Sequence, residues 1–299
     1  MKVFVTGATG YIGFGVATAF RRAGHEVVGL ARSEDKAKRL LENEIRPVIG
    51  TLQDPSTWRA AAEGASVLIH AAVDYQTDTA ALDRATVGHL LEAATTGPAP
   101  KTLVYTSGVW VSGDTGSDPA DETTPLRPPA LVAHRPGTEN LVLRATHVKG
   151  LVVRPGIVFG RQGGLTGLLF GGAASGSLTV VGDGANRWPM VHVDDLAEGY
   201  LRAVESGLSG EVFHFTDRSR YRVNDLAEAV ARTSGYAGTI AHASLAEASK
   251  TFGLMAECLA LDQHVDSRKA VRLLGWQPRH GGFVDGVATH LAAWKAAQA

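Results

Sequence analysis

The first residues of the chain combine a short apolar strand with a glycine-rich turn, an arrangement that can bind an anion. Residues 3–5 have strand character, Gly7, Gly10 and Gly13 mark the turn, and a helix is expected from Ile12. At such a corner, backbone N–H groups and the helix dipole both face the bound charge. Gly7 permits the tight turn, Gly10 lets a phosphate approach the backbone, and Gly13 lets helix and strand pack closely. The turn therefore predicts a cradle for the pyrophosphate of a dinucleotide cofactor, with contacts from Gly7, Thr9, Gly10, Tyr11 and Ile12.

The alternative interpretation is an ordinary strand–turn–helix corner, because 35 of the 299 residues are glycine and such triplets arise by chance. The context favours the cofactor. A second apolar strand at residues 26–30 follows the helix and completes a βαβ unit of roughly 30 residues, the length such a unit requires.

The end of that second strand indicates which nucleotide is bound. A site for NAD usually places an acid here, where it holds the ribose 2′-hydroxyl. In this chain Ala31 occupies that position and is followed by Arg32 and Ser33. A guanidinium binds phosphate through forked, charge-assisted hydrogen bonds. The sequence therefore predicts NADP(H) over NAD(H); the alternative is that Arg32 is a solvated loop cation.

Composition limits the remaining possibilities. The net charge is −1, which argues against bulk attraction to nucleic acid or to an anionic membrane surface. The single cysteine, Cys258, cannot form a disulfide within the chain, as expected in a reducing cytoplasm, and its apolar surroundings indicate a small buried residue. No apolar run reaches the roughly 18 residues of a membrane span. We expect a cytoplasmic protein.

Strands and helices alternate through the first half of the chain, which predicts an α/β fold with a Rossmann-type, doubly wound parallel sheet. The fourth strand ends in Ala71 and Ala72, whose small side chains leave room for a ligand at the carboxyl end of the sheet. Further strands are expected at 45–49, 66–72, 102–107 and 150–155, and helices at 34–43, 82–94 and 132–146.

The alternation loosens after Gly160. A strand is expected at 178–181, a strand at 211–215 returns to the main sheet, and helices are expected at 223–234, 266–274 and 291–297. We predict a dinucleotide-binding domain at 1–160 with 191–216 returning to it, and a smaller, interleaved substrate-binding lobe at 161–190 and 217–299.

With these pieces in place, the chain resembles the extended short-chain dehydrogenase/reductases, in the branch of the NAD(P)-dependent epimerases and dehydratases. The resemblance implies a Rossmann domain with a small C-terminal substrate lobe and a nicotinamide contact near Pro155. It also implies an adenine pocket near Thr51, Leu52, Ala71 and Ala72. The matching segments, in order, are 6–13, 70–72, 105–107, 154–160, 191–197 and 274–278.

The chain departs from this family at the catalytic pair. The family uses Tyr-x-x-x-Lys on the helix before the sixth strand, and the four-residue spacing places both side chains on one face. This chain has no Tyr between Tyr105 and Tyr200 and no Lys between Lys101 and Lys149. Aligning Glu139 with the family's helix glutamate places Leu131 at the Tyr position and Arg135 at the Lys position. The sequence therefore predicts an atypical active site.

Three residues remain candidates for the chemistry. Ser107 could hydrogen-bond a substrate carbonyl or cap a strand end. Arg135 could hold the cofactor ribose or an anionic substrate but cannot donate a proton near neutral pH, and a surface cation is the alternative. His134 could supply the proton or face solvent, and Tyr75 is another donor or a loop aromatic that closes over the substrate.

Other polar residues in the second half have structural alternatives. Arg187 and His192 match positions that meet a nucleotide-sugar's phosphates in relatives, whereas Asp194 and Asp195 are typical of a helix start. His70 is expected as a satisfied core histidine. No Cys/His cluster has metal-ligand spacing, so we predict no metal.

The leading hypothesis is an NADP(H)-dependent oxidoreductase that reduces the carbonyl of a small organic substrate. The second is epimerase or dehydratase chemistry on a nucleotide-sugar, which the missing phenol argues against. The third is a catalytically inactive NADP(H)-binding sensor or scaffold. Nucleic acid and membrane are not expected as partners, and a homodimer is expected only by analogy with relatives.

Overall fold

The computed structural model describes residues 1–161 and 163–298; Gln162 and Ala299, which belong to the expected lobe ranges 161–190 and 217–299, lie outside the described residues. The chain divides into two compact units. Unit 1 comprises Met1–Ser107, His134–Arg154 and Ala197–Phe213, and unit 2 comprises Gly108–Ala133, Pro155–Leu196 and His214–Ala299.

A seven-stranded sheet forms the centre of unit 1, in the order β10-β6-β5-β4-β1-β2-β3. Each strand from β6 to β3 in this order pairs in parallel with its neighbour. In β1, Val5 lies opposite Ile69 of β4 on one side and opposite Gly29 of β2 on the other. The order reverses between β1 and β4, so the carboxyl ends of these two strands flank a crevice. The strands are β1 Lys2–Thr6, β2 Glu26–Ala31, β3 Arg46–Ile49, β4 Val67–His70, β5 Lys101–Thr106, β6 Val148–Pro155 and β10 Glu211–Phe215.

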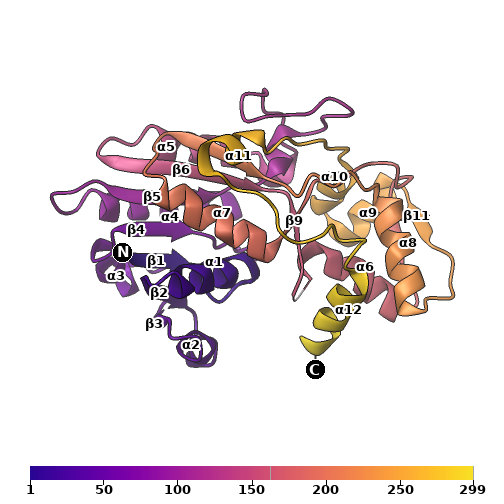
Figure 1. Cartoon of the computed structure of the whole chain (residues 1–299), viewed down its shortest axis with the longest axis horizontal. Helices are drawn as coiled ribbons and strands as arrows, with labels where there is room; N and C mark the ends of the chain where they lie inside the picture. Colours follow the sequence, from indigo (N-terminus) through magenta and orange to yellow (C-terminus); the bar gives the residue numbers. More distant parts are fainter. Residues whose placement is uncertain (162, 299) are drawn as a thin grey trace. The chain divides into compact units, whose positions relative to one another are not determined.

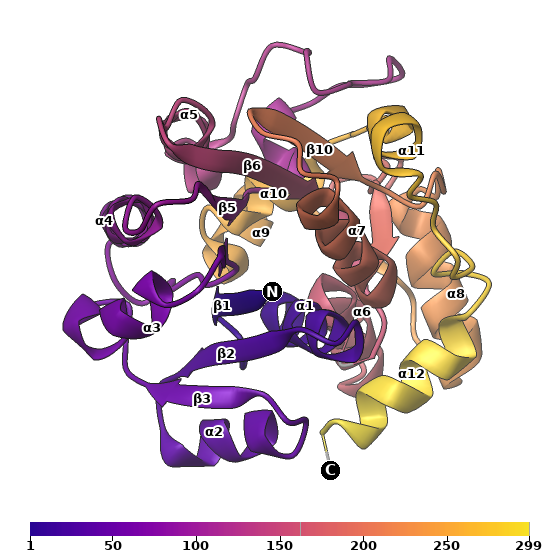
Figure 2. The same cartoon turned by 60° about the vertical axis from the view of Figure 1, so that its left-hand side comes forward.

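Helices cover both faces of this sheet, as a parallel sheet requires. Figure 2 shows α3, α4 and α5 on one face and α1 and α7 on the other. The strands are accordingly buried on both sides; every residue of β4 is buried, and Phe4 stacks on Trp58 with ring centroids 5.8 Å apart. The fold confirms the predicted doubly wound sheet. The helices are α1 Tyr11–Arg22, α2 Glu34–Leu41, α3 Arg59–Glu63, α4 Thr79–Ala94, α5 Arg135–Leu143 and α7 Val193–Glu205.

Unit 2 is built mainly of helices around its own apolar core, in which Phe159, Phe170 and Phe283 are buried. Helices α6, α8 and α12 pack together, and two small two-stranded sheets pair β8 with β11 and β7 with β9 (Figure 1). The elements are β7 Ile157–Phe159, α6 Gly167–Ala174, β8 Thr179–Val181, β9 Met190–His192, α8 Val223–Ser234, β11 Ala241–Ala243, α9 Leu245–Phe252, α10 Met255–Ala260, α11 Arg268–Leu274 and α12 Val287–Ala296.

Several predicted boundaries were wrong, for local reasons. The helix expected at 132–146 is only α5, because Pro136 lacks an N–H and is tolerated only in a first helical turn. The strand expected at 66–72 ends at His70, which leaves Ala71 and Ala72 in the segment after the strand. Helices α9 and α10 were not predicted; a Ser244–Glu247 capping box starts α9 and is a signal that could have located it.

A buried ion pair fixes α5 to β6 in unit 1. Arg154 donates to both carboxylate oxygens of Glu139, at 2.9 and 2.5 Å, and the two side chains are 4% and 3% exposed. Neutralising one partner would leave the other charge buried without a counterion. We expect Glu139→Gln to lower the free energy of unfolding by about 3–5 kcal/mol in urea denaturation.

The control for this prediction is Glu228→Gln, which removes a carboxylate from an exposed pair with Arg232 on α8. Exposed pairs contribute little, so this change should cost less than about 0.5 kcal/mol. Equal effects of the two substitutions would show that the buried pair does not hold α5 in place.

Candidate functional site

A pocket at the carboxyl ends of β1, β2 and β4 gathers most of the residues predicted to bind a dinucleotide. It lies wholly within unit 1. Of the predicted contacts, Ser33 and Pro155 are not on its wall: Ser33 caps α2 by accepting from the Lys36 N–H at 3.3 Å, and Pro155 ends β6. The predicted residues that line the pocket are Gly7, Thr9, Gly10, Tyr11, Ile12, Arg32, Thr51, Leu52, Ala71 and Ala72, and the sequence missed Leu30, Gln53, Val73 and Asp74 as their neighbours.

The glycine turn presses directly against the segment that follows β4. A Cβ on Gly7, which has a φ of 72°, would lie 2.4 Å from the carbonyl oxygen of Ala71. A Cβ on Gly13 would lie 2.1 Å from the carbonyl oxygen of Gly7. Side chains at these two positions are therefore excluded by backbone atoms, and the turn fits the backbone cradle that a pyrophosphate needs.

The start of α1 is available to an anion. Its N-cap is Gly10, which offers no side-chain hydrogen bond, and the first turn contains no acidic residue. The Gly10 N–H itself bonds the Gly7 carbonyl at 2.8 Å, which closes the turn. The positive end of the helix dipole is therefore not neutralised by a side chain of the first turn.

Arg32 follows β2 directly and lines the same pocket with its side chain exposed. No ion pair of Arg32 occurs within residues 1–161 and 163–298. The acid on the pocket wall is Asp74, and both of its oxygens are already engaged, one by Gln53 at 3.1 Å and one by the Gln76 N–H at 2.9 Å. The pocket thus offers a free guanidinium and an occupied carboxylate.

The end of β5 places Ser107 and Arg135 together. Arg135 Nη1 donates to the Ser107 carbonyl oxygen at 2.5 Å, which fixes both the strand end and the first residue of α5. Ser107 is 3% exposed, and its Oγ is buried without a hydrogen-bond partner in the described part of the chain. A buried hydroxyl without a partner is costly, so this group is poised to bond a ligand.

His134 lies beside a carboxylate that the sequence did not single out. Its Nε2 is 3.8 Å from Oδ2 of Asp83, which also accepts from Tyr105 at 2.8 Å. Asp83 Oδ1 lies 3.2 Å from Nε2 of His70, whose Nδ1 lies 2.6 Å from Thr6 Oγ1. His70 is therefore a satisfied core histidine, as expected. No motif marks Asp83, because its partners lie on β4, β5 and the start of α5.

Burial and neighbouring groups set the protonation states in this network. Burial raises the pKa of Asp83, but the hydrogen bonds of His70 and Tyr105 and the charges of His70 and Arg135 together outweigh it and hold the pKa below its ordinary value. Burial lowers the pKa of His134, although the Asp83 charge opposes that change. His134 and Asp83 share the wall of a small pocket with His70 and Arg135.

Two phenols of unit 1 are already engaged by other side chains. Tyr105 and Tyr200 are fully buried, and burial is the largest cause that raises the pKa of each hydroxyl above its ordinary value. Their hydroxyls are occupied by Asp83 and by Thr106, the latter at 2.7 Å. Tyr75 is 55% exposed. Leu131, aligned with the family tyrosine, lies in a short 3₁₀ turn at Ala130–Val132 before α5 begins.

Unit 2 holds the remaining polar residues that the sequence singled out. Asp194 pairs with Arg161 at 2.7 Å, and Asp195 accepts from the His280 backbone N–H and lies 2.9 Å from its ring nitrogen. His192 stacks on His280 at 3.8 Å, and burial, the largest cause, together with the His280 charge lowers the pKa of His192 to about 4.

His192, Asp194 and His280 form a group of polar atoms within 4.8 Å of one another that could hold a metal ion. All three residues already have protein partners, since the His192 Nδ1 also accepts from the Asp194 N–H at 3.2 Å. The prediction that the protein uses no metal therefore stays a prediction. Cys258 is buried and free, as expected of a small core residue.

The model of the NAD dependent epimerase/dehydratase family matches residues 3–215. Because this match spans more than half of the chain, the chain belongs to this family. The resemblance inferred from the glycine turn and the later segments is confirmed.

Relatives and solved structures agree with this assignment. A 4-hydroxy-2-methyl-3-oxo-4-farnesyl-3,4-dihydroquinoline-1-oxide ketoreductase from Stigmatella aurantiaca is 30% identical over 79% of this chain and 74% of that protein. A 3-diazoavenalumate denitrifying reductase from a Streptomyces species is 29% identical over 96% and 99%. A UDP-glucose 4-epimerase from Thermotoga maritima, solved with UDP-glucose, covers 100% of both chains with a TM-score of 0.84 at 20% identity, which shows the fold alone.

The family and its reductase relatives place the chain among the NAD(P)-dependent oxidoreductases of the short-chain dehydrogenase/reductase type. Within the described residues, no helix combines the length and the apolar character that crossing a membrane requires.

The close contacts of the glycine turn give a direct test of the cradle. Gly13→Ala forces a methyl group against the Gly7 carbonyl, so we expect it to abolish dinucleotide binding and to lower the free energy of unfolding by about 1–3 kcal/mol. Binding is measured by nicotinamide fluorescence and stability by urea denaturation.

Gly88→Ala on α4 is the matched control, because a Cβ there meets no atom within 4 Å. It should leave binding unchanged and stabilise the helix by about 0.5–1 kcal/mol. Full cofactor affinity in the Gly13→Ala variant would contradict the assignment of the cradle.

Proposed function

We propose that the protein is an NADP(H)-dependent oxidoreductase that reduces a carbonyl group of a small organic substrate. The observation that carries the proposal is the unit 1 pocket, which is lined both by the glycine turn and by Arg32, a guanidinium without an ion pair among the described residues. A backbone cradle suits the pyrophosphate, and a free guanidinium suits a 2′-phosphate better than a ribose hydroxyl.

The residues present fit such a cofactor. Gly7, Gly10 and the start of α1 would hold the pyrophosphate, Leu52, Ala71 and Ala72 would border the adenine, and Arg32 would meet the 2′-phosphate. Ser33, predicted to join Arg32, caps α2 outside the pocket wall. The resemblance adds a nicotinamide contact at Pro155. When bound, the nicotinamide would supply the hydride, and the residues of the protein would bind and orient the cofactor and polarise the substrate carbonyl.

Ser107 and Arg135 are proposed to act on the reacting carbonyl and its surroundings. The buried Ser107 hydroxyl can donate a hydrogen bond to a substrate oxygen, and this donation withdraws electron density from the carbonyl carbon. Arg135 holds the Ser107 backbone in place through its Nη1. Its remaining N–H groups can hold a cofactor ribose hydroxyl or an anionic group of the substrate, but they do not release a proton.

His134 is the proposed proton donor. Its imidazole can gain and lose a proton, its side chain is only partly buried, and Asp83 is close enough to stabilise the protonated ring. The phenols of Tyr105 and Tyr200 are ruled out for this role by their raised pKa values and their existing hydrogen bonds.

The assignment of 1–160 with 191–216 to cofactor binding and of the remaining ranges to substrate binding is part of this proposal. The proposal also includes a cytoplasmic location and assembly as a homodimer. An inactive sensor is the outcome to be excluded: it predicts tight NADP(H) binding without turnover on a panel of aldehydes and ketones, and one reduced substrate rules it out.

The cofactor preference is tested by titrating the protein with NADPH and NADH and following nicotinamide fluorescence. We expect tighter binding of NADPH. Because Arg32→Asp replaces an attractive charge with a repulsive one, it should weaken NADPH binding by about 10–100-fold and change NADH binding less than about twofold.

Arg144→Asp makes the same charge change in unit 1 away from the pocket wall, and it should affect neither titration. Equal affinities of the wild type for the two nucleotides would end the NADP(H) assignment. A parallel loss of both in Arg32→Asp would show that Arg32 does not read the 2′-phosphate.

The proton donor is tested through the pH dependence of carbonyl reduction. Burial lowers the pKa of His134 below its usual ~6.5, so the protonated ring is lost as pH rises through that lowered value. The reduction rate of the wild type should therefore fall with increasing pH, by up to about tenfold per unit. His134→Gln should lower kcat by about 10²–10⁴-fold and flatten this profile.

His89→Gln on α4 is the control, because its ring pairs with Glu92 outside this network. It should leave both kcat and the pH profile unchanged, and NADPH binding should be normal in both variants. A wild-type profile retained in His134→Gln would assign the proton to another group.

A further inference from the structure

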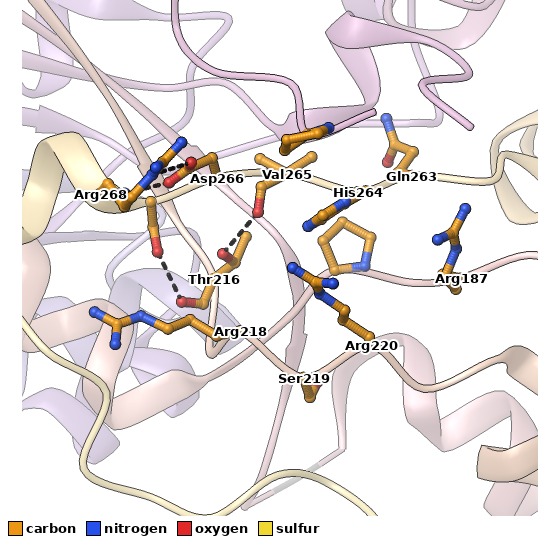
Figure 3. Close-up of a pocket in the computed structure, with 13 residues that line it drawn as sticks. Arg187, Thr216, Arg218, Ser219, Arg220, Gln263, His264, Val265, Asp266 and Arg268 are labelled. Atoms are coloured by element: carbon orange, nitrogen blue, oxygen red, sulfur yellow. Dashed lines mark hydrogen bonds and ion pairs between the residues drawn. The ribbon is translucent and has the colours of Figure 1, made fainter. Parts of the chain in front are cut away.

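Another large pocket lies wholly within unit 2, and four arginines line it. Its wall is formed by the loop between β10 and α8, by the segment before α11, and by Arg187. Figure 3 shows Arg218 and Arg268 at one end, Arg187 at the other, and Arg220 beside His264 between them. None of these residues belongs to the dinucleotide pocket of unit 1.

Two of the four guanidinium groups are already neutralised. Arg187 donates to both oxygens of Asp262 at 2.8 and 2.7 Å, and the bond to Asp262 raises the pKa of Arg187. Arg268 pairs with Asp266. These two pairs build the wall and contribute little net charge, so Arg187 is not required as a ligand.

Arg218 and Arg220 remain. Both are exposed at the pocket, and neither has an ion pair anywhere in the chain that the structure describes. The residue between them, Ser219, lies beside the Asp217 carboxyl, whose Oδ1 accepts from the Ser219 N–H at 2.8 Å. Burial raises the pKa of Asp217, and a hydrogen bond from the Ser219 side chain opposes that change. Arg218 and Arg220 thus present two charges, neither in an ion pair among the described residues, to one cavity.

The backbone of this loop disfavours an arginine. Arg218 has a φ of 65°, in the left-handed region that glycine adopts readily and that long side chains rarely adopt. Glycine would serve the turn better, so the side chain at this position costs stability rather than adding it. An arginine held in this conformation, two residues from a second arginine that also has no ion pair among the described residues, points to a ligand.

We propose that this pocket binds a small organic or inorganic anion that carries at least two negative charges on phosphate or carboxylate groups. Arg218 and Arg220 supply the charged contacts through their guanidinium groups. Forked guanidinium groups match planar and tetrahedral oxyanions through paired N–H donors. The site is separate from the cofactor pocket and does not rest on the proposed reductase activity.

The test is isothermal titration of the full chain with inorganic pyrophosphate at low, fixed ionic strength. We expect saturable binding that includes a component lost in Arg218→Gly and in Arg220→Gln, each weakening it by about tenfold or more. If citrate competes with pyrophosphate for the arginine-dependent component, the site also accepts carboxylates. If citrate does not compete, the site is specific for phosphate groups.

Arg272→Gln, on α11 outside the pocket, is the matched control for loss of one positive charge in unit 2. It should change the affinity less than about twofold. Arg218→Gly should melt at the wild-type temperature or above it, because glycine relieves the backbone conformation.

Three outcomes would overturn the proposal: no saturable binding, binding unchanged in the double variant Arg218→Gly/Arg220→Gln, or a marked fall in melting temperature in Arg218→Gly. The second would place the pyrophosphate in another site, such as the glycine turn of unit 1. NADPH binding is measured in a separate titration. Failure of the anion proposal therefore leaves the cofactor proposal standing, and failure of the cofactor proposal leaves the anion proposal standing.

Discussion

The cofactor pocket of unit 1 depends on one close approach of backbone to backbone. The Gly7 turn lies so near the Ala71 carbonyl that no side chain fits at Gly7, and the start of α1 lies so near Gly7 that none fits at Gly13. This contact sets where α1 begins relative to the ends of β1 and β4. The direction of the helix dipole and the position of Ala71 and Ala72 beside the turn follow from it, and Arg32, directly after β2, lines the same pocket.

The changed catalytic residues share a physical logic. In the family pattern, a lysine on the helix lowers the pKa of a tyrosine four residues earlier; here an arginine follows a proline-rich segment, and α5 begins at Arg135 itself. Its guanidinium bonds a backbone carbonyl instead of tuning a phenol. We propose that proton transfer falls instead to the adjacent His134, whose Nε2 lies 3.8 Å from Asp83, a carboxyl with a pKa held below its ordinary value.

The sequence predicted the parts that local patterns encode. Alternation of apolar runs with polar helices was enough for the doubly wound sheet, and the glycine spacing located the turn to the residue. It could not reveal Asp83, because the partners of this carboxylate lie on three other elements brought together only by folding. It also overextended α5, since helical periodicity continues through Val132 while Pro136 decides where the helix starts.

The arginines also show that the sequence alone does not reveal partners brought together by folding. Arg187 and Arg218 look alike in the sequence, yet Asp262, 75 residues further on, neutralises the first, whereas the second has no ion-pair partner in the described chain. Whether a cation is structural or available therefore depends on long-range pairing, which composition and spacing do not report. Arg32 belongs with Arg218 in this respect: each follows a strand of the main sheet, lines a pocket and remains unpaired. Unpaired guanidinium groups at pocket walls are therefore the features of this molecule that most directly indicate where anions bind.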